Sequence, residues 1–312
     1  MGFDGVCSNE TAHDSFIPLS LAATSTSKVK LETRVAIAFP RSPMITSYLA
    51  RDINELSEGR FRLGLGTQVK GHIERRFSTK WESPSKKLKE YISSIRAIWN
   101  SWQTDEKLNY EGEFYNFSLM TPFFSPGSLD VERPQIYVAG VGPKMVEIIG
   151  ESADGFFVHP FHTPDHMEAE TLPVLRSAAE SAGRAATDVT VACLTIVAMG
   201  RDDAEVEDAR SKAAAQLAFY GSTPAYAGVL DFHGYENLQP ELNQLSKQGD
   251  WKQMTEKIDD DLVDLLCVSG TPAEVGAKLK DRNQFADRST MMFYGAPPDP
   301  DAIADTVKAA RS

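Results

Sequence analysis

The chain has 312 residues, of which 42% are hydrophobic and 24% are charged, as in a folded globular protein rather than a disordered or fibrous one. Its 44 acidic residues outnumber its 32 lysines and arginines, and the formal net charge is −12. Nucleic-acid binding relies on clustered cations, so this balance argues against a nucleic-acid partner. A chain of this length suits either two average domains or one α/β barrel.

The three cysteines, Cys7, Cys193 and Cys267, lie far apart and form no metal-binding spacing with histidines. An odd and sparse cysteine count is typical of a reducing compartment, and no metal site is expected. No apolar run approaches the ~20 residues of a membrane span, and the first residues lack the basic and apolar regions of a signal peptide. We therefore expect a cytoplasmic protein without membrane association.

Short β-branched or aromatic runs alternate with helical patterns along the chain. The clearest helix covers 84–102, where Leu88, Ile92 and Ile95 recur at helical spacing. Near-continuous apolar strands that alternate with helices indicate a parallel sheet covered on both faces, as in doubly wound sheets and barrels. Seven runs are predicted as strands: Phe3–Cys7, Leu31–Phe39, Phe61–Gly66, Gln135–Ala139, Gly155–Pro160, Val189–Met199 and Ser289–Tyr294.

Two stretches, 103–133 and 219–260, interrupt this alternation. The first contains Tyr110–Tyr115, which is predicted as a small hairpin, followed by a segment rich in proline and glycine. The second is polar and contains several glycines. In a barrel, such insertions follow strands and often form lids or substrate walls. The chain 1–312 is predicted to be one domain with these two insertions.

Glycines mark the ends of two predicted strands. Leu63–Thr67 contains two glycines but lacks the third glycine of a dinucleotide-binding fingerprint, and a tight corner of a barrel is the alternative explanation. Gly140–Lys144 joins a strand to a helix, with Pro143 at the first helical position. The free N–H groups of such a turn bind anions readily, although an ordinary strand-to-helix connection would have the same pattern.

Polar residues follow two further strands. Glu10 and His13 lie in the segment after the first strand, and His159 and His162 follow a later one. At the carboxyl ends of parallel strands, such side chains face the mouth of a barrel, where a histidine can transfer a proton near neutral pH. A purely structural role is the alternative for each histidine.

Three motifs, Thr33–Pro43, Gly59–Thr67 and Tyr137–Pro143, follow one another in an order that resembles the bacterial-luciferase-like superfamily. The segments 153–156 and 268–272 match as well, so the resemblance covers nearly the whole chain. Within the superfamily, the chain most resembles oxidoreductases that use the deazaflavin coenzyme F-420. The resemblance implies a (β/α)8 TIM-type barrel with the ring of F-420, or of FMN as the alternative, in its C-terminal mouth.

The resemblance also implies particular cofactor contacts. In the family, the strand that matches Thr33–Ala38 carries a non-proline cis peptide behind the ring, which corresponds here to Arg34–Val35 or Val35–Ala36. The Gly140–Gly142 turn matches the segment whose amides hold the cofactor phosphate. Arg75 and Arg76, in the basic loop 70–76, are expected to face the acidic tail of F-420, with a solvated surface turn as the alternative. The remaining residues expected at the cofactor are Arg34, Val35, Ala36, Gly66, Thr67, Ala139, Gly140, Val141, Gly142, Lys144 and His159.

The chain departs from the family pattern in three places. The family has a strand and a helix before the segment that starts at Gly2, so the resemblance implies a truncated start or an incomplete barrel. Thr11 splits the usual acid–histidine pair, which leaves His13 as the candidate for proton transfer, with Glu10 to orient or replace it and His159 as a competitor. Gln68 stands near the position where sugar-phosphate dehydrogenases of the family carry an acidic residue, which argues against their substrate.

The leading hypothesis is an oxidoreductase that moves a hydride between F-420 and a small organic substrate, with the protein supplying position and electrostatics. The first alternative is a monooxygenase that uses reduced FMN and oxygen. The second alternative is a non-catalytic flavin-binding barrel. A homodimer and a separate flavin or F-420 reductase are the partners that these hypotheses imply.

Overall fold

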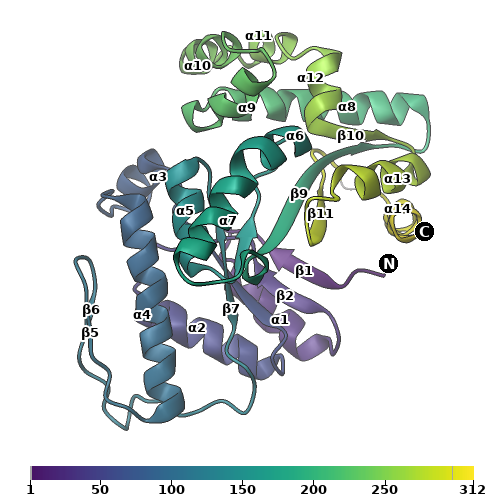
Figure 1. The fold of residues 1–312 in the computed structure, drawn as a ribbon. Helices are drawn as coiled ribbons and strands as arrows, with labels where there is room; N and C mark the ends of the chain where they lie inside the picture. The colour runs from purple at the N-terminus through teal and green to yellow at the C-terminus, as the bar shows by residue number, and fades with distance from the viewer. Residues whose placement is uncertain (1, 297) are drawn as a thin grey trace.

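Parallel strand pairing organises this computed structural model, which describes residues 2–296 and 298–312 (Figure 1). The main sheet runs in the order β1-β2-β4-β7-β8-β9-β10, and β11 pairs with β9 while β3 pairs with β4. Every pair in this sheet is parallel, so the predicted α/β fold with a parallel sheet is confirmed. Its strands are β1 (Gly5–Ser8), β2 (Lys30–Thr33), β3 (Ala36–Ile37), β4 (Phe61–Gly66), β7 (Gln135–Ala139), β8 (Gly155–Phe157), β9 (Thr190–Met199), β10 (Cys267–Gly270) and β11 (Arg288–Met292).

Helices connect these strands and pack against the sheet (Figure 1). None of the helices within the described residues is both long enough and apolar enough to cross a membrane. The α-helices are α1 (Phe16–Ser25), α2 (Pro43–Leu56), α3 (Lys70–Arg75), α4 (Pro84–Thr104), α5 (Pro143–Ser152), α6 (Pro164–His166), α7 (Leu172–Ser181), α8 (Asp203–Gly221), α9 (Ala227–Phe232), α10 (Leu238–Gln248), α11 (Trp251–Glu256), α12 (Asp260–Leu266), α13 (Pro272–Arg282) and α14 (Pro300–Arg311). A π-helical turn (Met167–Thr171) continues α6, and short 3-10 turns cover Ala186–Asp188 and Pro224–Tyr226.

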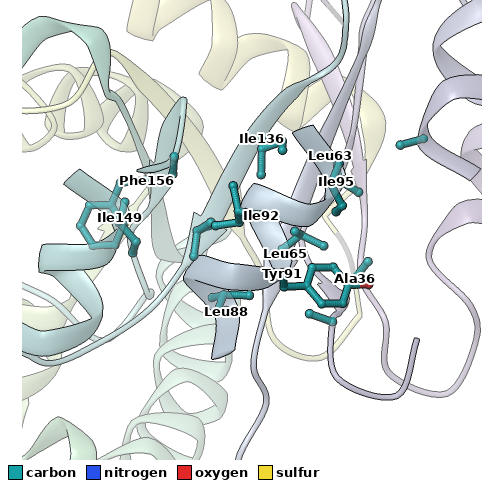
Figure 2. Packing of buried hydrophobic residues seen from close by; sticks show 14 of the residues in the cluster. Ala36, Leu63, Leu65, Leu88, Tyr91, Ile92, Ile95, Ile136, Ile149 and Phe156 are labelled. Atoms are coloured by element: carbon teal, nitrogen blue, oxygen red, sulfur yellow. The ribbon is translucent and has the colours of Figure 1, made fainter. Parts of the chain in front are cut away.

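The largest core lies between one face of the sheet and its helices. Leu63 and Leu65 of β4 are fully buried in the same apolar cluster as Ile92 and Ile95, which belong to the predicted apolar face of α4 (Figure 2). Full burial of each such side chain contributes roughly 1.5–3 kcal/mol. Because side chains alternate along a strand, Gly64 faces the opposite, inner side of the sheet.

Three segments differ from the sequence-based expectation. The strand β10 is not among the predicted strands. It pairs with β9 in parallel, and Cys267 lies beside Ile196. The predicted strand 31–39 is divided into β2 and β3, with a non-proline cis peptide between Arg34 and Val35, one of the two positions that the resemblance implies. The insertion 219–260 is mainly helical, with α9, α10 and α11. The predicted hairpin is confirmed as β5 (Tyr110–Glu111) paired antiparallel with β6 (Asn116–Phe117).

Side-chain contacts join segments at the two ends of the sheet order. Arg34, which follows β2, donates to the Thr290 hydroxyl on β11 at 3.1 Å. Arg288 of β11 donates to the Glu32 carboxylate on β2 at 3.1 Å. The two chain ends lie near each other (Figure 1). Arg311, near the C-terminus, forms an ion pair with Asp4 at 2.6 Å. The curved sheet therefore brings β11 close to β2 without a direct strand pairing between them in the described residues.

Gly64 is expected to tolerate no side chain. A Cβ there would lie 1.9 Å from the Thr33 carbonyl oxygen and 2.4 Å from Phe157 Cε2. The Thr33 backbone is itself held in place, because the Thr33 hydroxyl donates to the Gly64 carbonyl and accepts from the Gly64 N–H, both at 2.8 Å. Gly64→Ala should therefore lower the free energy of unfolding, measured by urea denaturation, by about 2–3 kcal/mol.

Gly228→Ala is the matched control, because a Cβ at Gly228 would meet only His166 Nε2 at 3.9 Å. Its unfolding free energy should stay within about 0.5 kcal/mol of the parent value. Equal stability of the two variants would contradict this account of how β2 and β4 approach each other.

Candidate functional site

The carboxyl ends of β3, β4, β7 and β8 form one continuous rim. In the strand register, Ile37 lies beside Gly66, Gly66 beside Ala139, and Ala139 beside Phe157. Ala36, Gly66 and Ala139, which are more than 100 positions apart at the extremes, thus come together as the parallel topology requires. The structure places this part of the expected cofactor site in one location.

Val35 supplies an apolar side chain next to Gly66 at this rim. A Cβ on Gly66 would lie 2.6 Å from Val35 Cγ2, so the glycine permits a close approach of the two strands. Val35 and Ala139 pack against an inner cluster that includes Tyr137 and Phe157. The rim is therefore lined by small and apolar side chains.

The Arg34 side chain points away from the rim into the interior of the sheet. Its guanidinium donates to the Ala192 carbonyl at 3.0 Å and to Glu32 at 3.3 Å, and it lies 4.3 Å from the centre of the Phe157 ring. Only 9% of Arg34 is exposed. Any contribution of Arg34 to a ligand at the rim would come from its backbone.

Glu10 joins the loop after β1 to the rim. Its carboxylate accepts from the Ile37 N–H at 2.7 Å and from Arg41 at 2.8 Å, and Arg41 also pairs with Asp14 at 2.7 Å. His13 lies three residues after Glu10 on the same loop and is exposed. The structure gives Glu10 fixed partners and leaves the imidazole of His13 accessible.

Helix α3 lies beside this same loop. Arg76, the residue that follows α3, donates to the Thr11 carbonyl at 2.5 Å and lies over the Phe77 ring. Arg75 and Lys70 are exposed on α3. The cations of 70–76 therefore stand on the β4 side of the rim, close to the Glu10–His13 loop.

The Gly140–Gly142 turn leads directly into α5. A Cβ on Gly140 would lie 2.2 Å from Met145 Cγ, whereas the Cβ position of Gly142 has no atom within 4 Å. Gly142 has a φ of +78° and its carbonyl accepts from Met145 and Val146, which starts the helix. The first amides of a helix have no partner within it, so this open turn can bind an anion. Lys144 is exposed beside it.

A cavity of about 620 Å³ adjoins the turn on its β8 side. Besides Gly140–Pro143, its walls come from the segment after β8 and from the helical insertion. The lining includes His159, Phe161, His162, His166, Tyr226 and Phe232. Tyr226 is a site residue that sequence reasoning missed, because nothing local in 219–260 indicates that it would meet His159.

Two histidines at this cavity are neutral. Burial lowers the pKa of His159 to about 3, and burial together with the Arg282 charge lowers the pKa of His162 to about 3. His162 bridges the His159 carbonyl at 2.9 Å and the Cys193 sulfur at 3.2 Å, so its ring is committed to the core. The ring of His159 stacks on Tyr226 with centroids 4.3 Å apart.

Comparison with known proteins identifies the family. A family model described as luciferase-like monooxygenase matches residues 1–289. The chain belongs to this family. The resemblance predicted from the three motifs is therefore confirmed.

Relatives are similar over most of their length. The chain is 42% identical over 296 residues to an uncharacterized protein of Mycobacterium tuberculosis, covering 95% of this chain and 87% of the relative. It is 29% identical over 292 residues to the 5,10-methylenetetrahydromethanopterin reductase of Archaeoglobus fulgidus, covering 91% and 81% of the two chains. The solved structure of the coenzyme F-420-dependent tetrahydromethanopterin reductase from Methanopyrus kandleri has the same fold, with a TM-score of 0.75, 21% identity and coverage of 99% and 90%.

The buried imidazole of His162 should make stability depend on pH. Its pKa is about 3 when folded, against about 6.5 for an unfolded histidine, so the unfolded chain binds the extra proton between these values. The free energy of unfolding should therefore fall as the pH drops below 6.5, with a loss of about 2 kcal/mol between pH 7 and pH 5 from this residue.

His162→Gln provides the comparison, because glutamine does not titrate. Chemical denaturation at pH 7 and pH 5 should show a loss smaller by about 2 kcal/mol in the variant than in the parent. Equal losses in both proteins would show that His162 is not buried in its neutral form.

Proposed function

We propose that this protein is an oxidoreductase that transfers a hydride between coenzyme F-420 and a small organic substrate. The observation that carries the proposal is the open Gly140–Pro143 turn at the start of α5, directly after the rim residue Ala139. Similarity to a methylenetetrahydromethanopterin reductase and to the fold of an F-420-dependent reductase supports it. A homodimer and a partner reductase remain predictions.

The chain's residues fit a cofactor that joins a flat ring to a phosphate. Val35, Gly66 and Ala139 would support the ring, since the strands approach closely where Gly66 has no Cβ. The amides around Gly142 would hold the phosphate, because the space at its Cβ position is open. When bound, the cofactor would supply the redox chemistry, and the protein would orient it and exclude water.

The charge around the turn favours F-420 over FMN. On the β4 side stand Arg75, Arg76 and Lys70, the last paired with Glu74 at 3.9 Å, whereas the cavity on the β8 side is lined by Glu170 and Asp231. The acidic tail that the resemblance implies for F-420 would therefore run toward α3. FMN has a phosphate but no such tail, so α3 would have no role in its binding; the family's description as monooxygenases keeps FMN as the alternative.

His13 is the proposed group for proton transfer or polarisation of the ring. It is exposed on the loop that Glu10 fastens to Ile37 and Arg41, so Glu10 acts as its positioning residue. His159 is the weaker candidate, because burial keeps it neutral at pH 7 and its ring nitrogens already have partners.

Gly142→Asp should weaken F-420 binding. The new carboxylate would stand beside the phosphate at the helix N-terminus, where negative charge on the protein opposes an anionic ligand. The variant Gly142→Asn shares the unfavourable φ of +78° and adds no charge, so it isolates the electrostatic part. Quenching of F-420 fluorescence should show an affinity roughly tenfold lower for the aspartate than for the asparagine variant. Equal affinities in folded variants would remove this turn from the cofactor site.

The double variant Arg75→Ala/Arg76→Ala should weaken tailed F-420 more than its tail-less precursor. Exposed ion pairs are screened, so the difference should be several-fold at low salt and should shrink at high salt. Lys247→Ala/Lys252→Ala, which removes two cations from α10 and α11, is the charge-matched control and should affect both ligands equally. Equal losses for both ligands in the arginine variant would assign Arg75 and Arg76 a structural role.

A further inference from the structure

The cavity on the β8 side shares the Gly140–Pro143 turn with the proposed phosphate position but lies away from the rim proposed for the cofactor ring. Phe156 and Val158 line it, whereas Phe157, between them in the sequence, packs in the inner cluster with Val35. The cavity thus lies outside the sheet, between β8 and the helices α7 and α9, from which Val174 and Val229 contribute. Its volume of about 620 Å³ is in the range of sites for small organic molecules.

Charge at this cavity is one-sided. Among the described residues that line it, the charged side chains are the exposed carboxylates of Glu170 and Asp231. No lysine or arginine is present among these lining residues. Most of the other walls are apolar, including Val146, Met167 and Phe232. Away from the Gly140–Pro143 turn, an anionic ligand would meet the repulsion of these carboxylates without a compensating cation, whereas a neutral molecule would not.

The hydrogen bonds of His159 determine that the Tyr226 oxygen accepts a hydrogen bond from this histidine. The Phe161 N–H donates to His159 Nδ1 at 3.2 Å, so the ring proton of the neutral imidazole resides on Nε2. Nε2 then donates to the Tyr226 oxygen, 3.1 Å away. Burial raises the pKa of Tyr226 to about 12, so its hydroxyl keeps its own proton near pH 7. That proton is left to donate to a ligand.

His166 forms part of the cavity wall. His166 Nδ1 is buried and has no hydrogen-bond partner among the described residues, although His166 lines the cavity. The ring of His166 meets the Phe232 ring edge-to-face, with centroids 5.5 Å apart.

We propose that this cavity binds a neutral, mainly apolar molecule that presents a carbonyl or ether oxygen to the Tyr226 hydroxyl. The apolar walls would contact the hydrocarbon part of the molecule. The exposed carboxylates of Glu170 and Asp231 would select against anions. The inference goes beyond the proposed redox function and does not depend on it, because binding can be measured without any cofactor.

Isothermal titration with 2-nonanone and with nonanoate tests this proposal, since the two probes share chain length and differ in charge. The parent protein should bind one 2-nonanone per chain, at least tenfold more tightly than nonanoate. Tyr226→Phe, which removes only the hydroxyl, should weaken the ketone three- to tenfold, as expected for one hydrogen bond. Ala225→Trp, at an exposed position of the lining, should fill the cavity and abolish binding.

The double variant Glu170→Gln/Asp231→Asn should narrow the gap between nonanoate and 2-nonanone at low salt. Absence of ketone binding to the parent protein, equal affinity for both probes, or parental affinity in both Tyr226→Phe and Ala225→Trp would each overturn the proposal. Thermal unfolding of each variant checks that it is folded. Because F-420 binding is measured separately, a negative result here leaves the cofactor proposal to its own test.

Discussion

The close approach of β2 and β3 to β4 is the constraint on which the rim depends. Thr33 and Gly64 exchange two hydrogen bonds at 2.8 Å, in a space where even a Cβ would collide with the Thr33 carbonyl. Directly beyond this contact, Val35 covers Gly66. The glycines of Leu63–Gly66 are therefore needed for packing between strands, and the same packing produces the small, apolar surface at the carboxyl ends of the sheet.

Two regions of different charge meet at the Gly140–Pro143 turn. Because β7 lies between β4 and β8, the turn has the cations of α3 on one side and the cavity with Glu170 and Asp231 on the other. An anionic group attached to a phosphate bound at the turn would thus be attracted toward the cations of α3 and repelled from the carboxylates of Glu170 and Asp231.

The parts of this arrangement that sequence reasoning predicted are those with local signals. Gly66 and Gly140 stand at strand ends with recognisable turn chemistry, and the apolar periodicity of α4 follows directly from its residues. The direction of the Arg34 side chain was not predictable in this way, because its partners Ala192 and Thr290 are about 160 and 260 positions away along the chain. The partnership of His159 with Tyr226 likewise depends on how the 219–260 insertion folds back over β8, which brings together two residues 67 positions apart.

Titration of the purified protein with F-420 and, in parallel, with FMN, followed by the fluorescence of each cofactor, tests the proposed cofactor most directly. The rim, the open helix N-terminus and the cations of α3 together predict micromolar binding of F-420 and clearly weaker binding of FMN. Micromolar binding of FMN with no response to F-420 would contradict the proposed cofactor.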